Sequence, residues 1–140
     1  MVSHISVEFV KNGTIRLRLL IDTNVIIDFL KKDPSLFDLS SLFSQHECFT
    51  SVIVKLELLK YPDITPEEEN AANGFLRLVP IIPLSQPIES ETIALSRSTK
   101  LKLPDAIIGA TAIVYGAEIV TSDSHFLECQ YESLKIWDAS

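Results

Sequence analysis

The sequence contains few of the residues that mark zinc-binding, disulfide-rich or membrane-spanning proteins. Its two cysteines, Cys48 and Cys129, lie far apart, with no CxxC pair and no cluster of histidines. This pattern excludes a cysteine-rich zinc site and a disulfide framework, and it predicts two partly buried free thiols in a reducing compartment. No apolar run approaches the roughly 20 residues that a membrane helix needs.

Basic residues are also scarce, with 12 Lys and Arg against 19 Asp and Glu, so the formal net charge is −7. This balance excludes a strongly basic protein that coats nucleic acid, but it leaves open an enzyme that reaches phosphate groups through bound metal ions. The first residues, MVSHISVEFVKNG, lack both the basic start and the unbroken apolar stretch of a signal peptide. We therefore expect a cytoplasmic protein without membrane contact.

The 140 residues, of which 46% are hydrophobic, predict one globular domain. Near the N-terminus, apolar residues alternate with polar ones on both sides of Asn12-Gly13, which predicts a β-hairpin. A three-residue loop ending at this glycine pairs Phe9 with Ile15 and Glu8 with Arg16. We prefer this register to that of a two-residue loop because it separates apolar from charged faces.

After the hairpin, short apolar runs alternate with helical stretches. The predicted strands cover 17–21, 47–50, 78–82, 118–121 and 134–137, and the predicted helices cover 23–32, 52–60, 86–98, 105–115 and a stretch that follows Thr65. At this last helix, Thr65 and Glu68 are spaced as a capping box. The alternation predicts a parallel sheet covered by helices on both faces, with the functional site beyond the carboxyl ends of the strands.

Four acidic residues lie where such a fold gathers a site. Asp22 directly follows an apolar strand, Asp123 follows the end of a later strand, Asp105 opens a helix, and Glu57 lies within an apolar helix. Taken singly, each aspartate is more simply explained as a helix cap. For Glu57, a surface pair with Lys60 and a functional carboxylate are about equally favoured, because a carboxylate among apolar neighbours is costly unless it is paired or bound to metal. Together at one edge of the sheet, they predict a site for Mg²⁺ or Mn²⁺ and the chemistry of phosphodiester hydrolysis.

Four sequence segments carry a resemblance to a known family. They are LIDTNVIID at 20–28, TSVIVKLELL at 50–59, LPDAIIGATA at 103–112 and IVTSDSHF at 119–126. In this order and at these spacings, the chain from about residue 17 onward resembles the PIN-domain ribonucleases, and most of all the VapC-type toxins of toxin–antitoxin pairs.

The resemblance implies an α/β fold, a three-layer sandwich with a parallel sheet of about five strands. It places the PIN-like nuclease domain at 17–140. Family members usually begin just before the first strand, so residues 1–16 form an N-terminal β-hairpin extension, which we expect to be an ordered appendage.

The resemblance also implies the roles of individual residues. An acidic quartet holds Mg²⁺ or Mn²⁺ for endonucleolytic cleavage of RNA, which leaves a 5′-phosphate and a 3′-hydroxyl. The quartet consists of Asp22, Glu57, Asp105 and Asp123, with Thr23 and Asn24 orienting the first aspartate and Thr121 lining the site.

Partners follow in the same way. The resemblance implies an RNA substrate, a cognate antitoxin whose basic segment blocks the cleft, and a homodimer. An apolar stripe at Ala71, Phe75 and Leu78 also favours a dimer, because a small domain does not readily hide such a stripe.

Several alternatives remain beside this interpretation. The residues argue against two of them. A haloacid-dehalogenase-type phosphatase needs a second acid two residues after Asp22, where this chain has Asn24. A receiver domain needs paired acids before the strand that ends at Asp22, where the chain has only Glu8. A non-catalytic PIN-like module that binds RNA or protein stays open.

Some residues near the motifs have two interpretations. His125 is favoured as a surface residue in a turn, with phosphate contact as the second reading. Trp137 is expected to pack at the end of the last strand. The basic residues that flank the motifs either guide RNA or are ordinary exposed side chains, and the sequence does not choose among Lys55, Lys60, Arg97, Lys100 and Lys102.

Overall fold

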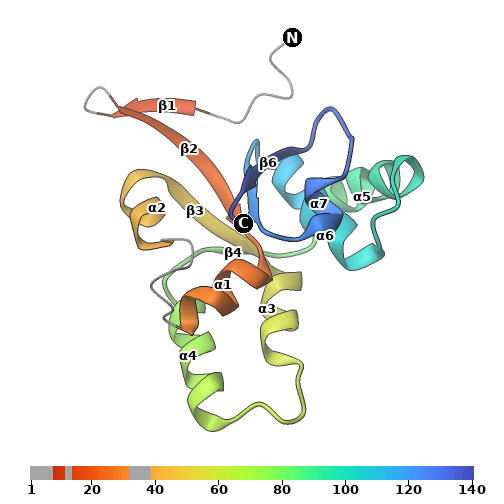
Figure 1. Cartoon of the computed structure of the whole chain (residues 1–140). Coiled ribbons are helices and arrows are strands. Elements are labelled where there is room, and N and C mark those ends of the chain that lie inside the picture. Colours follow the sequence, from red (N-terminus) through yellow and green to blue (C-terminus); the bar gives the residue numbers. More distant parts are fainter. Residues whose placement is uncertain (1–7, 12–13, 32–38) are drawn as a thin grey trace.

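A computed structural model describes residues 8–11, 14–31 and 39–140, with side chains from residue 15 onward. Five parallel strands form the central sheet, and an antiparallel strand, β1, pairs with β2 (Figure 1). In spatial order the parallel strands are β4 (Ile81–Ile82), β3 (Glu47–Ser51), β2 (Thr14–Ile21), β5 (Glu118–Thr121) and β6 (Lys135–Asp138), and β1 covers Glu8–Lys11. The parallel sheet of about five strands is therefore confirmed.

Helices cover both faces of this sheet. Successive residues of a strand point to opposite faces, and Leu19, Leu20 and Ile21 of β2 are all fully buried. Figure 1 shows α1, α3 and α4 grouped below the sheet and α5, α6 and α7 at its right. The helices in the described ranges are α1 (Thr23–Leu30), α2 (Leu39–Gln45), α3 (Val52–Leu59), α4 (Pro66–Leu76), α5 (Gln86–Ser98), α6 (Leu103–Val114) and α7 (Ser124–Leu127).

Most predicted elements are present, and the differences have local causes. The capping box at the start of α4 is confirmed, because the Thr65 hydroxyl accepts from the Glu68 N–H at 3.1 Å and the Glu68 carboxylate accepts from the Thr65 N–H at 2.9 Å. The strand predicted at 78–82 is reduced to β4, because the Leu78 N–H bonds back to the Phe75 carbonyl and continues the helix end. Two short helices, α2 and α7, were not predicted, since neither has enough turns to show a clear periodicity. The expected end of the first helix, at 32–34, lies outside the described residues.

The predicted register of the hairpin is wrong by one residue. Phe9 pairs with Arg16 instead of Ile15, and the pairing of Lys11 with Thr14 leaves two residues between the strands. Asn-Gly is the sequence that two-residue hairpin connections prefer, and this local preference outweighs the sorting of faces. Residues 12–13 and the rest of the predicted hairpin before residue 8 lie outside the described residues.

Two smaller expectations are confirmed. Cys48 and Cys129 are free and partly buried, and burial raises the pKa of the Cys48 thiol to about 12. Trp137 lies in β6, where its ring packs edge-on against His46 with 5.4 Å between ring centroids. None of the helices in the described ranges is long and apolar enough to span a bilayer.

Two helical glycines differ in their surroundings and lead to a prediction. A Cβ added at Gly109 of α6 would lie 2.9 Å from the Leu95 Cδ2, whereas one added at Gly74 of α4 would meet no atom within 4 Å. Gly74→Ala should raise the free energy of unfolding by about 0.5–1 kcal/mol, as expected for a helix interior. Gly109→Ala should lower it by about 1 kcal/mol, because Leu95 is fully buried and has little room to move.

Urea denaturation of the two variants measures this difference directly, provided that the slope of the transition is unchanged. Equal stabilisation by both substitutions would show that α5 and α6 are not packed as closely as described.

Candidate metal centre

The sheet brings the ends of β2 and β5 to one edge. The two strands are parallel neighbours, and the Asp22 N–H donates to the Val120 carbonyl at 3.0 Å. Asp22 and Asp123 follow the carboxyl ends of these strands, so both begin the next helix at the same edge of the sheet.

Asp22 is held from two sides. Its Oδ1 accepts from the Thr23 N–H at 2.8 Å, and its Oδ2 accepts from the Thr121 hydroxyl at 2.7 Å. Asp22 is only 4% exposed to solvent. Burial raises its pKa to about 6, against the lowering effect of these two hydrogen bonds, and the nearby charges of Asp105 and Glu57 raise it further. Asp22 is thus a buried acid whose neighbouring charges are of its own sign.

Glu57 is connected to Asp22 through one threonine. The Thr23 hydroxyl donates to the Glu57 Oε1 at 2.7 Å, and the Thr23 backbone N–H donates to the Asp22 Oδ1. Lys60, the surface partner considered from the sequence, lies over the ring of Tyr61 with its Nζ 5.5 Å from the ring centroid. Glu57 therefore faces the strand-end edge, and Thr23 positions two of the four acids.

Asp105, Asp123 and His125 form a tight group, with one candidate ligand atom of each within 4.8 Å of the others. Burial raises the pKa of Asp105, and the charges of Asp123 and Glu57 raise it further, whereas His125 and Lys102 lower it. The electrostatic effects on Asp22 and Asp105 therefore connect all four acids of the predicted quartet.

The capping alternative applies to only two of the three aspartates. Asp22 and Asp123 do cap α1 and α7 with their side chains. Asp105 does not cap α6, because this helix begins at Leu103, two residues before the predicted start, and its N-cap is Lys102. Pro104 sits in the first turn, where it starts helices readily. The carboxylate of Asp105 therefore has no capping role.

Thr121 and Asn24 support the strand-end loop. The Thr121 hydroxyl donates to Asp22 and accepts from the Asp123 N–H at 3.0 Å, so one side chain links two acids. The Asn24 Oδ1 accepts from the Ser122 N–H at 3.4 Å. Asn24 thus holds the loop before Asp123, whereas the family resemblance predicts that it orients Asp22.

His125 lies at this site, although the sequence pattern favours a surface histidine in a turn. Its side chain is 73% exposed, as expected of a surface histidine, yet its Nδ1 lies 2.9 Å from the Asp123 Oδ1. The only signal in the sequence is its position two residues after a strand-end aspartate.

The residues present fit a hard divalent cation. Carboxylate oxygens are the ligands that Mg²⁺ and Mn²⁺ prefer, and the described part of the chain places no lysine or arginine in an ion pair with Asp22. A buried carboxylate without a compensating charge is costly, and a bound cation supplies that charge.

The comparisons with known proteins agree with this geometry. The family model of the PIN domain matches residues 19–130, a range that contains all four acids. Among curated proteins, none matches the chain significantly.

Several solved structures have the same fold. A toxin–antitoxin complex from Klebsiella pneumoniae is 28% identical, with a TM-score of 0.63, and the match covers 84% of this chain and 99% of that one. VapBC-1 from nontypeable Haemophilus influenzae is 20% identical with a TM-score of 0.72, covering 87% and 98%. VapBC2 from Rickettsia felis, bound to a DNA fragment from its promoter, is 19% identical with a TM-score of 0.71, also covering 87% and 98%.

Proposed function

Because the chain belongs to the PIN domain family, we propose that it is a metal-dependent endoribonuclease and the VapC-like toxin of a toxin–antitoxin pair. The observation that carries this proposal is the convergence of four carboxylates at the carboxyl edge of the sheet, two of them with a raised pKa. We assign residues 17–140 to the nuclease domain and residues 1–16 to an extension.

In this proposal Asp22, Glu57, Asp105 and Asp123 hold Mg²⁺ or Mn²⁺. Such an ion, when bound, supplies a Lewis acid and lowers the pKa of a coordinated water. The chain supplies the orientation: Thr121 and the backbone of Thr23 fix both oxygens of Asp22, and the Thr23 hydroxyl fixes Glu57. His125 restrains the Asp123 carboxylate from the solvent side.

Incubation of the purified protein with a mixed RNA pool tests this function. We expect cleavage in Mn²⁺ or Mg²⁺ and none in EDTA. A folded protein that leaves the pool intact in both metals would instead favour the alternative, a non-catalytic PIN-like module that binds RNA or protein.

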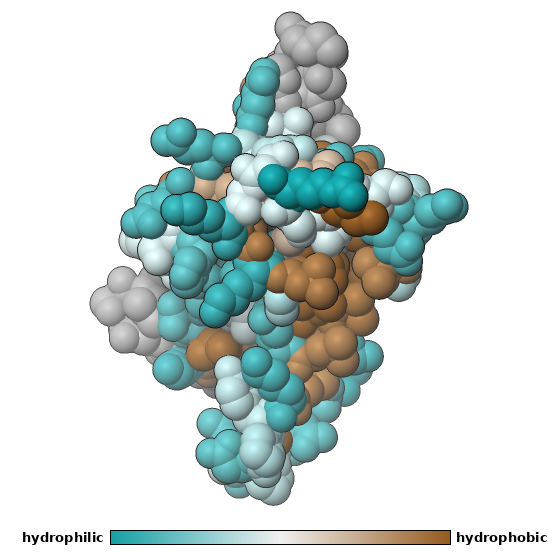
Figure 2. Space-filling model, turned by 90° about the vertical axis from the view of Figure 1, so that its right-hand side faces the viewer, coloured by the Kyte–Doolittle hydropathy of each residue, from teal (hydrophilic) through white to brown (hydrophobic). Residues whose placement is uncertain are grey.

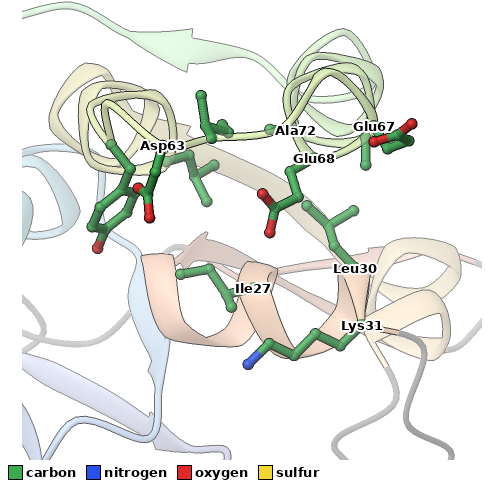
Figure 3. Close-up of a pocket in the computed structure, with 11 residues that line it drawn as sticks. Ile27, Leu30, Lys31, Asp63, Glu67, Glu68 and Ala72 are labelled. Atoms are coloured by element: carbon green, nitrogen blue, oxygen red, sulfur yellow. The ribbon is translucent and has the colours of Figure 1, made fainter.

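The cognate antitoxin is the second proposed partner, since the solved neighbours are toxin–antitoxin complexes. A cavity of about 650 Å³ lies between α1, α3, the segment 61–64 and α4 (Figure 3). Its apolar wall includes Ile27 and Leu30, and Figure 3 shows the carboxylates of Asp63 and Glu68 directed toward α1. An antitoxin segment with apolar and basic side chains complements this groove.

The homodimer needs a different surface from the predicted stripe. Phe75 is only 3% exposed, because its ring packs against Phe29 and Phe43 with centroids 6.2 and 5.6 Å away. The stripe at Ala71, Phe75 and Leu78 is therefore not continuous on the surface. Figure 2, which faces the side of α5 and α6, shows an apolar area between polar regions. Large apolar side chains are exposed on three packed helices, namely Leu56 of α3, Ile93 of α5 and Leu103 of α6.

We predict a dimer through this face of α3, α5 and α6. Light scattering at high micromolar concentration should give the dimer mass for the wild type and the monomer mass for Ile93→Lys, because a charge on the buried face opposes association. Leu78→Lys is the matched control, since Leu78 is 72% exposed on the segment after α4. A monomeric wild type would refute the prediction of a dimer. A monomeric Leu78→Lys protein would instead show that the interface includes the end of α4.

A further inference from the structure

A second cavity lies beside the candidate metal centre. It has a volume of about 430 Å³ and is formed by the end of α5, the segment 99–102, α7 and the residues that follow α7. His125 belongs to both places, because it lines this cavity and its Nδ1 lies 2.9 Å from the Asp123 Oδ1. The imidazole of His125 therefore connects the wall of this cavity to Asp123 of the acidic quartet.

We propose that this cavity binds one nucleotide of a single-stranded RNA, next to the phosphate that lies at the metal centre. The proposal rests on the proposed function and adds a substrate subsite to it. The volume falls within the range of about 300–1,000 Å³ that is typical of small-molecule sites. The three kinds of group that a nucleotide requires, a cation, polar groups and apolar surface, all line the same cavity.

The cation is Lys100, whose exposed side chain has no hydrogen bond or ion pair with the described residues. A free ammonium group at this position can neutralise a backbone phosphate. Of the five basic residues that flank the sequence motifs, Lys100 is the one that lines this cavity. The tertiary structure thus makes a choice that the sequence left open.

The polar groups come from the residues that follow α7, and the apolar surface comes from both walls of the cavity. Glu128 offers carboxylate acceptors and Gln130 offers both a donor and an acceptor, which are the groups that read base edges and ribose hydroxyls. Leu101 and Cys129 are partly buried and add apolar surface for a base. Glu128 repels phosphate, so the phosphate belongs near Lys100 and the base or ribose near Glu128.

The walls of the cavity are held in place without the ligand. The Thr99 hydroxyl donates to the Leu95 carbonyl at 2.8 Å and accepts from the Leu101 N–H at 3.3 Å, which fixes the segment that carries Lys100. On the other side, Phe126 of α7 is fully buried and anchors the residues that lead to Gln130. A preformed cavity lowers the cost of ordering a nucleotide.

The test compares Lys100→Ala and Gln130→Ala with Arg77→Ala. The control removes the same charge as Lys100→Ala, from an exposed residue that caps the far end of α4 and leads to the amino end of β4. Lys100→Ala should raise the KM for RNA cleavage about five- to tenfold with kcat close to wild type, as expected for the loss of one charged contact. Gln130→Ala should change the nucleotide preferred at one position beside the cleaved bond, read by sequencing the product ends.

Binding of a short fluorescein-labelled single-stranded RNA in EDTA provides a readout that is independent of activity. Lys100→Ala should weaken binding about five- to tenfold, and Arg77→Ala should not change it. If both cavity variants fold and keep the wild-type KM, cleavage pattern and affinity, the subsite is rejected while the nuclease stands. If the wild type cleaves no RNA, the proposed function fails, and the binding comparison between Lys100→Ala and Arg77→Ala still decides whether the cavity holds RNA.

Discussion

Replacing Asp105 by asparagine should leave the chain folded and reduce RNA cleavage by orders of magnitude. The N-cap of α6 is Lys102 and no side chain makes a capping hydrogen bond there, so the substitution breaks no hydrogen bond at the start of the helix. The substitution removes one charge and a strong ligand for a hard cation, and the amide that replaces it binds such cations weakly.

The metal-free Asp105→Asn protein should also be equally stable or more stable than the wild type. Burial and the charges of Asp123 and Glu57 raise the pKa of Asp105, which means that the folded chain disfavours its charged form. Above the pKa of the folded state, the neutral amide relieves this repulsion. Thermal unfolding in EDTA measures the difference.

A matched control removes a carboxylate from another part of the chain. Asp63→Asn changes the net charge by the same amount at the groove between α1 and α4, and it should keep the wild-type cleavage rate. An Asp105→Asn protein that cleaves RNA as fast as the wild type would refute the assignment of the metal centre.

Saturating Mn²⁺ or Mg²⁺ should raise the melting temperature substantially. A ligand that binds only the folded state at 100 times its dissociation constant adds about 2.7 kcal/mol, which corresponds to about 10 °C for a domain of this size. KCl at the same ionic strength is the control for general screening. A melting temperature that responds to neither metal nor EDTA would show that the quartet does not bind metal.

The rise in melting temperature that the metal causes should be larger at higher pH, because Asp22 must lose its proton to bind the metal. Burial raises the pKa of this carboxyl to about 6, so below that pH it is mostly protonated and the proton competes with the metal. The same shift makes the metal-free chain lose stability as the pH rises from the ordinary aspartate range to about 6, because in this range the unfolded chain releases the Asp22 proton while the folded chain retains it. The metal-induced rise should therefore be larger at about pH 7.5 than at about pH 5.

Much of the candidate site follows from local sequence signals. An acid directly after a buried strand lies at the strand's carboxyl end whatever the rest of the chain does, and parallel pairing brings Asp22 and Asp123 to one edge. The capping box at Thr65 likewise depends only on residues three apart. Signals of this kind survive folding because they involve neighbours in the chain.

The tertiary structure decided what depends on distant partners. The sequence pattern predicts that Phe75 is exposed for a dimer contact. In the fold, Phe29 of α1 and Phe43 of α2 pack against its ring and cover it. His125 and Lys100 lie far apart in the sequence, and only the tertiary fold places them on one cavity. Local patterns determine which residues begin helices and end strands, whereas burial and shared cavities depend on contacts between segments that the sequence alone does not bring together.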